Sequence, residues 1–203
     1  MTTTTRLAYW QRYIDNDGRW RGARRPEGAD LAALRRGIGR APGTVPGMWP
    51  YYTGGPEHDV YADPRSDTWQ PHPAFVAQHH ALTLYGLHQQ SQTAAAHKPG
   101  VGVGAAVAAL HRVHGASSEA IDRRFLACVS AASVDELAVH LRGLITQLKG
   151  VTPLPAIDYD QLTKDLTWWP DPDRRTTIRR RWGLDYQQAT RPDTTETEPE
   201  EST

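Results

Sequence analysis

The spacing of apolar residues is the feature that most constrains how this chain can fold. After residue 99, apolar side chains recur three and four positions apart, which is the period of a helix with one buried face. Ser133 followed by Glu136 forms a capping box, and Leu137, Leu141 and Leu144 behind it supply an apolar face. No segment shows the alternation of a half-buried strand. The sequence therefore predicts an all-α protein built as a helical bundle.

The remaining helices are placed by the same periodicity and by capping residues. Residues 73–92 are apolar on nearly every side, which is typical of a helix surrounded by other helices, so this segment is expected to be central. Asp158 with Gln161 marks another helix start. In chain order we expect helices at about 7–14, 26–36, 73–92, 102–114, from a cap at Ser117 or Ser118 to about 129, 133–148, 158–169 and 173–188.

The chain is expected to consist of two small helical parts followed by a tail. Residues 1–98 form the first part, residues 99–190 form a C-terminal helical bundle, and residues 191–203 are acidic and without apolar side chains. Such a tail cannot offset its ordering entropy by burial, so we expect it to be disordered. Within the first part, residues 37–73 are rich in proline and glycine and predict a long irregular connection with one short helical turn.

Length and composition exclude several classes of protein. No apolar run approaches the roughly 20 residues that a membrane-spanning helix needs. The threonine-rich start, residues 1–6, has no apolar stretch like that of a secretory signal, and one cysteine cannot build a disulfide framework. We therefore expect a cytoplasmic protein without a membrane partner.

Histidines and glycines suggest metal or nucleotide chemistry, but their spacing does not support it. His79 and His80 are adjacent, so on a helix their side chains point about 100° apart and cannot share an ion. His58 with Asp59 resembles the metal-binding pair of HD phosphohydrolases, which lies on a helix in that class and in the proline-rich connection here. The alternating glycines of 100–104 have no strand before them, so they predict a close-packed helix start.

Catalytic residues are also missing from the sequence. Cys128 lies in an apolar stripe, which indicates a packing residue and not a nucleophile. The histidines are interpreted as polar or capping residues. We expect no enzymatic activity, no catalytic residue, no metal and no cofactor.

Arginine is the residue type that points to a binding function. The formal net charge is zero, but the tail holds five acids and one arginine, which leaves 22 basic and 18 acidic residues in the rest of the chain. Twenty of the 23 basic residues are arginine, which suits contact with phosphate or carboxylate, although a GC-rich genome gives the same bias. Arginines beside the apolar faces of four helices are candidates for one phosphate-tracking groove. These candidates are Arg35, Arg36, Arg123, Arg124, Arg142, Arg174, Arg175 and Arg179.

A second basic cluster lies near the N-terminus, in a segment that contains glycine. It consists of Arg19, Arg21, Arg24 and Arg25 around Trp20. Arginine beside an aromatic ring can stack on unpaired bases, but an exposed loop without a ligand gives the same pattern. Both interpretations stay open at this point.

An ordered set of motifs runs through about residues 6–186. The motifs are Trp10, Ala33-Leu34-Arg35-Arg36, 81–90 (ALTLYGLHQQ), Gly102-Val103-Gly104, Arg123-Arg124-Phe125, His140-Leu141-Arg142, Ile157-Asp158-Tyr159 and 165–169 (DLTWW). In this order they resemble the CasB family, the small subunit of the type I-E CRISPR surveillance complex Cascade.

The resemblance implies an all-helical, non-enzymatic protein that is present in two copies in the complex. Its implied partners are the CRISPR guide RNA, the target and displaced DNA strands of the R-loop, the Cascade backbone and large subunits, and the second copy as a homodimer. Basic surface residues would make the nucleic-acid contacts; seven of the eight candidate arginines match the family by position, and Arg179 is added from its place on the last helix. The 37–73 connection and the acidic tail depart from the family pattern, and we transfer no role to them.

Two other classes of function are compatible with the residues alone. A free-standing helical DNA-binding regulator needs a helix-turn-helix, and the last predicted helix lacks the short turn and helix expected before it. A scaffold that uses its tryptophans and arginines only for protein contacts is harder to exclude. The apolar face of the helix at 158–169 is expected to consist of Tyr159, Leu162, Leu166 and Trp169. Trp168 is also expected at a helix packing face, so Trp168→Ala is predicted to cost roughly 3–5 kcal/mol of stability if the ring is fully buried.

Overall fold

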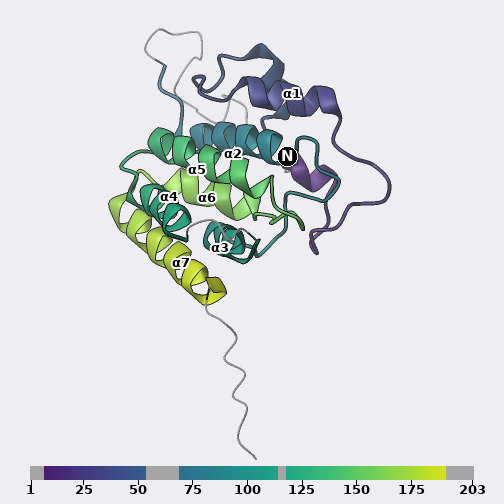
Figure 1. Ribbon diagram of the computed structural model, residues 1–203. Coiled ribbons are helices and arrows are strands. Elements are labelled where there is room, and N and C mark those ends of the chain that lie inside the picture. The colour runs from purple at the N-terminus through teal and green to yellow at the C-terminus, as the bar shows by residue number, and fades with distance from the viewer. Residues whose placement is uncertain (1–6, 54–68, 114–117, 191–203) are drawn as a thin grey trace, which may run out of the picture.

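The computed structural model describes residues 7–53, 69–113 and 118–190, and these residues form helices and their connections (Figure 1). In them, β pairing is limited to two isolated bridges, Ile14 with Trp20 and His97 with Ile157. The all-α prediction is therefore confirmed. The α-helices are α1 (Gly28–Arg36), α2 (Pro73–Gln89), α3 (Val103–Val113), α4 (Ser118–Ser130), α5 (Val134–Leu148), α6 (Tyr159–Trp168) and α7 (Pro172–Thr190), and the 3-10 helices are η1 (Trp10–Arg12) and η2 (Pro46–Tyr51).

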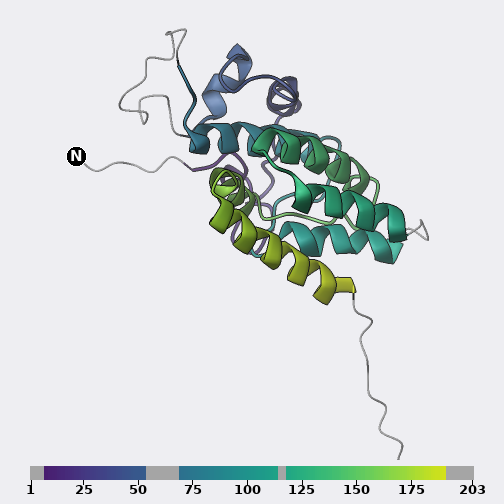
Figure 2. The same ribbon diagram turned by 90° about the vertical axis from the view of Figure 1, so that its left-hand side faces the viewer.

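Helix α2 occupies the centre of the bundle, as its apolar sequence predicts. It packs against α1 on one side and against α5 and α6 on the other, and α3 packs against α4, α5 and α7. Figures 1 and 2 show α7 along the edge of the bundle that is remote from α1. None of the helices in the described part of the chain combines the length and hydropathy of a membrane span.

Capping residues start α5 and α6 where the sequence predicts. The Ser133 Oγ accepts a hydrogen bond from the Glu136 amide at 3.1 Å, and the Glu136 carboxylate accepts one from the Ala132 amide at 2.7 Å. Asp158 Oδ1 accepts from the amides of Asp160 and Gln161 at 3.0 and 2.9 Å. Ser133 and Asp158 satisfy amides of the first turn that have no partner inside the helix, and Glu136 holds the amide of Ala132 just before the cap.

The predicted helix over residues 7–14 is wrong. Only the short helix η1 forms there, and Leu7, which was expected on the buried face, is 55% exposed. Trp10 is buried because it packs across the chain, where its Nε1 donates to Asp160 Oδ1 at 2.8 Å. Gln11 Nε2 donates to the other oxygen of Asp160 at 2.9 Å. Tertiary contacts with α6, and not an amphipathic helix, hold this segment.

The long connection behaves as predicted where it is described. Helix η2 is the one short helical turn that was expected within residues 37–73. His58 and Asp59, like the tail 191–203, lie outside the described residues. One cluster of buried apolar residues includes residues on both sides of position 98, so the core has no break at the predicted boundary. The division into two parts stays a prediction.

The prediction that Trp168 is buried is wrong, and its neighbour Trp169 takes the interior position. Trp169 is fully buried, whereas Trp168 is 47% exposed. Successive side chains of a helix point about 100° apart, so two adjacent tryptophans cannot both face the same core. Trp169 continues the buried face of Leu162 and Leu166, at spacings of four and three residues.

The glycines before and within α3 allow two helices to come very close. A Cβ added at Gly104 would lie 2.0 Å from the carbonyl oxygen of Trp182 and 2.9 Å from the amide of Tyr186, both on α7. Only hydrogen fits in this space. The predicted interpretation of residues 100–104 as a close-packed helix start is confirmed.

His79 gives the protein a pH-dependent term in its stability. The ring is buried between α2 and the connection, with Nδ1 2.8 Å from the Tyr52 hydroxyl and Nε2 3.1 Å from the Gly37 carbonyl. Burial lowers the pKa of His79 to about 4 from its usual 6.5. Between pH 6.5 and 4 the unfolded chain therefore takes up a proton that the folded protein does not, and stability falls as pH falls, by about 1.4 kcal/mol per pH unit at most.

We expect His79→Gln to reduce the pH dependence of stability by this one contribution, because glutamine keeps a donor and an acceptor but does not titrate; His80, His88 and His97, whose pKa values burial also lowers, still contribute. The measurement is the urea unfolding free energy of both proteins at several pH values from 7 to 4. Parallel curves for the two proteins in that window would show that His79 is not the source.

Candidate nucleic-acid interface

The first group of candidate arginines lies where the end of α1 faces α5. Arg35 is half-buried, and its Nε donates to the Leu31 carbonyl at 3.3 Å, while Arg36 is exposed. Lys149, at the end of α5, has its pKa lowered by burial and, second, by the nearby charge of Arg35. Arg142 and Lys149 are seven residues apart and so share one face of α5. Cations of α1 and α5 therefore gather on one side of the bundle.

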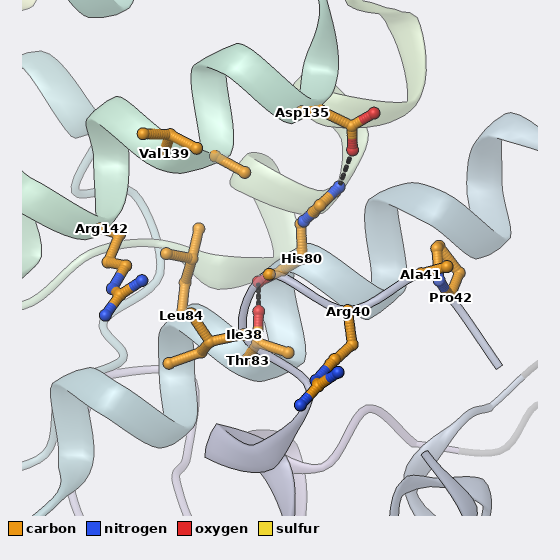
Figure 3. A pocket seen from close by; sticks show the side chains of 12 residues that line it. Ile38, Arg40, Ala41, Pro42, His80, Thr83, Leu84, Asp135, Val139 and Arg142 are labelled. Atoms are coloured by element: carbon orange, nitrogen blue, oxygen red, sulfur yellow. Dashed lines mark hydrogen bonds and ion pairs between the residues drawn. The ribbon is translucent and has the colours of Figure 1, made fainter. Parts of the chain in front are cut away.

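A cleft of about 350 Å³ lies on this side, between α2, α5 and the connection after α1 (Figure 3). Arg142 and Arg40 flank an apolar floor that includes Leu84, and Figure 3 shows their guanidinium groups on opposite sides of it. At the other end of the cleft, His80 Nε2 lies 2.9 Å from Asp135 Oδ1. Burial is the main cause that lowers the pKa of His80, and Asp135 opposes it. The cleft thus offers two separated cations to an anionic ligand.

The second group consists of Arg123 and Arg124 on α4, which are exposed and lie near two different helices. In the amide orientation that satisfies both partners, the Gln147 oxygen on α5 accepts from Arg124 Nη1 and Nε at 2.9 and 3.0 Å. Arg123 lines a groove between α4 and α7 together with Leu126 and Tyr186. Adjacent helical residues point apart, which explains why this pair divides between α5 and α7.

In the third group, on α7, two of the three arginines donate hydrogen bonds to backbone carbonyls of the protein itself. Arg175 Nη1 donates to the Ala132 carbonyl at 2.8 Å, and Arg179 Nη2 donates to the Ala131 carbonyl at 2.9 Å. Both carbonyls follow the C-terminal end of α4, where the negative end of the helix dipole favours cations. Arg174 instead lies over the exposed ring of Trp168, with its guanidinium carbon 4.2 Å from the ring centroid.

The structure therefore distributes the eight candidates over three surfaces. Three clefts of the described residues contain one candidate each, namely Arg142, Arg123 and Arg174. Arg175 and Arg179 hold α7 against the end of α4, so their first role is structural. The prediction that all eight line one continuous groove stays a prediction.

The second basic cluster, near the N-terminus, has local partners. The guanidinium carbon of Arg25 lies 4.5 Å from the Trp20 ring centroid, and its Nη1 donates to the Gly22 carbonyl at 2.8 Å. Arg24 lies over Tyr13 at 5.6 Å. These arginines have aromatic and backbone partners within their own segment, which favours the interpretation as a self-contained surface loop.

Three groups with metal-ligand chemistry meet at His97, Asp158 and Asp160. His97 Nδ1 accepts a hydrogen bond from the Tyr159 amide at 3.0 Å, so in the neutral ring the proton is on Nε2, which faces Asp160 at 3.7 Å. Burial lowers the pKa of His97, which favours this neutral ring. Asp158 also accepts from the Gly100 amide at 2.8 Å. The acidic oxygens and the ring nitrogen are thus occupied in joining the N-terminal segment, the turn before α3 and α6.

The only cysteine and the other histidines fit the predicted packing and capping roles where they are described. Cys128 is fully buried, and burial raises the pKa of its thiol to about 12. His72 Nδ1 accepts from the Ala74 amide at 3.1 Å and so caps α2. Burial lowers the pKa of His88 to about 3, and its Nδ1 lies 3.0 Å from the Tyr159 hydroxyl.

Sequence reasoning missed several exposed or cleft-lining residues. Arg40 was not singled out because it lies in the irregular connection, where no periodicity indicates which side chains meet. Trp168 and Lys164 were not considered as surface residues, although both fall outside the helical spacing of Leu162, Leu166 and Trp169. The spacing of the buried residues on α6 could therefore have indicated that Trp168 and Lys164 lie on the surface.

Comparison with known proteins identifies the family. The sequence model of the CRISPR-associated protein Cse2 family matches residues 30–186. CasB from Thermobifida fusca is 29% identical, with a TM-score of 0.61 over 78% of this chain and 84% of that protein. A Cse2-family protein from Thermus thermophilus is 26% identical, with a TM-score of 0.57 over 79% of this chain and 86% of the other. No curated protein matches the chain.

One further similarity is of fold only. A chain in the structure of a CRISPR RNA-guided surveillance complex is 24% identical, with a TM-score of 0.57 over 81% of this chain and 84% of that chain. The fold and these matches define a helical CRISPR-associated protein. The chain belongs to the Cse2 family, and the resemblance to CasB that its motifs indicate is confirmed.

Proposed function

We propose that this protein is the non-catalytic small subunit of a type I-E Cascade surveillance complex in the cytoplasm. The single observation that carries the proposal is the family match over residues 30–186. Further support comes from the fold shared with a chain of an RNA-guided surveillance complex and from five exposed candidate arginines. These are Arg36, Arg123, Arg124, Arg142 and Arg174.

In this function the protein stabilises the guide RNA, the target strand and the displaced strand without reading their sequence. Exchange of a DNA duplex for an RNA–DNA hybrid is nearly neutral in free energy, so modest contacts with the separated strands shift the balance. Guanidinium groups bind phosphates without base preference, and the guide supplies specificity by pairing. The proposed protein partners are the backbone and large subunits of the complex and a second copy of this chain.

Purification of the tagged full-length protein from its own cells, at moderate and at low salt, tests the proposal. We expect RNAs of uniform length that share a repeat-derived end, together with other subunits of the complex. If neither salt concentration recovers such RNA, a separate nucleic-acid binder or a scaffold becomes the better interpretation.

Reversal of the exposed pair on α4, Arg123→Glu with Arg124→Glu, is expected to leave folding intact and to weaken binding of target DNA by the complex. Each lost phosphate contact lowers the slope of log affinity against log salt by about 0.7 to 0.9, so the slope should fall by about 1.5. The control is Arg24→Glu with Arg25→Glu, which makes the same change of charge in the self-contained N-terminal loop and should have a smaller effect. Binding that equals wild type at every salt concentration would remove the α4 pair from the interface.

A further inference from the structure

A cleft between α6 and α7 differs from the other two clefts in its chemistry. It encloses about 470 Å³ and is lined by Lys164, Trp168, Arg174, Thr177 and Arg181, with Ile178, which is buried, as its aliphatic member. We call it the Trp168 cleft. The cleft beside Arg142 has Ile38, Leu84 and Val139 in its lining, and the groove beside Arg123 has Phe125, Leu126 and Val129. All three clefts contain a cation, but the Trp168 cleft is distinguished by an exposed aromatic ring, because Phe125 and Tyr186 in the groove beside Arg123 are buried.

Trp168 is held in place and still accessible. The ring is 47% exposed, and the Arg174 guanidinium carbon lies 4.2 Å from its centroid, which restricts the ring and leaves part of it open. Lys164 is exposed one helical turn before Trp168, on the same face of α6. An aromatic side chain with a fixed orientation loses little conformational entropy when a ligand stacks on it.

The charge around the cleft favours an anionic ligand. Lys164, Arg174 and Arg181 contribute three positive charges, and the acidic residues Asp165 and Asp173 contribute two negative charges. Asp165 is buried, and it is paired with Arg181 and accepts a hydrogen bond from Trp182 Nε1 at 2.8 Å. Its charge is thus balanced by Arg181, and Lys164 and Arg174 with the exposed Asp173 leave a net charge of +1 next to the exposed ring.

We infer that Trp168 stacks on one unpaired nucleobase and that Lys164 and Arg174 contact the phosphates beside that base. The inference rests on the proposed function and adds a contact of a different kind, because stacking depends on the base and phosphate contacts do not. Basic grooves with aromatic side chains are the usual design of surfaces that bind single strands without sequence preference. A partner helix would pack on aliphatic side chains, and Ile178 is the one aliphatic residue in this lining.

The test measures binding of the full-length protein to two fluorescent oligonucleotides, a single-stranded oligothymidylate and an abasic strand with the same number of phosphates. Trp168→Ala is expected to weaken binding of oligothymidylate about tenfold and to leave binding of the abasic strand unchanged. The salt slope should stay at the wild-type value, because no phosphate contact is lost. Trp168→Phe, which keeps an aromatic ring, should restore most of the affinity.

A matched control is Trp49→Ala, which truncates another partly exposed tryptophan, on η2 and outside the Trp168 cleft. It should bind both strands as wild type does. If Trp168→Ala binds oligothymidylate as tightly as wild type, the stacking contact is refuted while the proposed function stands. If wild type binds neither strand, the stacking inference fails, and the proposed function is decided separately by recovery of RNA and subunits from cells. If Trp168→Ala lowers recovery of the other subunits without a change in strand binding, Trp168 contacts a protein and the inference is overturned.

Discussion

Trp169→Ala is expected to cost about 3–5 kcal/mol of the free energy of unfolding, the usual range for loss of a buried tryptophan. The ring is fully buried, and its centroid lies 5.6 Å from that of Trp182 on α7. Its Nε1 donates to the Ala131 carbonyl at 3.2 Å, and the Arg179 guanidinium carbon lies 5.5 Å from its ring centroid. Truncation therefore leaves a cavity where α6, α7 and the end of α4 meet.

The neighbouring tryptophan provides the control for this prediction. Trp168→Ala removes a side chain that is 47% exposed and should cost less than about 1 kcal/mol. Urea unfolding of the two variants and the wild-type protein, followed by circular dichroism, gives the comparison. Equal losses in the two variants would contradict the assignment of Trp169 to the interior and Trp168 to the surface.

Gly104→Ala is the second substitution with a large expected effect. The new methyl group would lie 2.0 Å from the carbonyl oxygen of Trp182, and backbone atoms cannot rotate away as the end of a side chain can. Helices α3 and α7, which share the most extensive helix contact of the fold, must then separate. We expect a loss of about 3 kcal/mol, at the upper end of the usual cost of overpacking a core.

Gly183→Ala tests whether the effect comes from the close approach and not from alanine itself. Gly183 lies on α7, and a Cβ there meets no atom within 4 Å. Alanine has a higher helix propensity than glycine, so the free energy of unfolding of this variant should rise by up to about 1 kcal/mol. Thermal unfolding measures both variants. A Gly104→Ala protein as stable as wild type would show that α3 and α7 do not approach as closely as the structure indicates.

The helices could be predicted from the sequence because their signals are local. Ser133 and Asp158 cap amides two or three residues ahead of them, and the apolar face of α5 repeats within one segment. The segment around Trp10 was predicted wrongly because its partner, Asp160, is 150 residues away. Helical spacing of apolar residues within one segment does not predict a contact between residues that are so far apart in the sequence.

The candidate interface was less predictable for the same reason. An arginine beside an apolar stripe has the same sequence pattern whether it binds phosphate or a distant carbonyl. Arg175 and Arg179 reach carbonyls that are 43 and 48 residues earlier in the chain, and only the packing of α7 brings them together. Arg40 enters a cleft through an irregular connection, and no periodic pattern indicates that position.

The hydrogen bond between Trp10 and Asp160 also determines how early the N-terminal segment can form its native contacts during translation. The indole and the side-chain amide of Gln11 bind a carboxylate that is made about 150 residues later. At a synthesis rate of roughly 5–20 residues per second, that carboxylate follows about 8 to 30 seconds after the indole. Trp10 and Gln11 stay without this partner for that time, whereas the Tyr9 hydroxyl donates to Asp30, which is 21 residues later. Trp10 and Gln11 are therefore among the last residues to reach their native contacts.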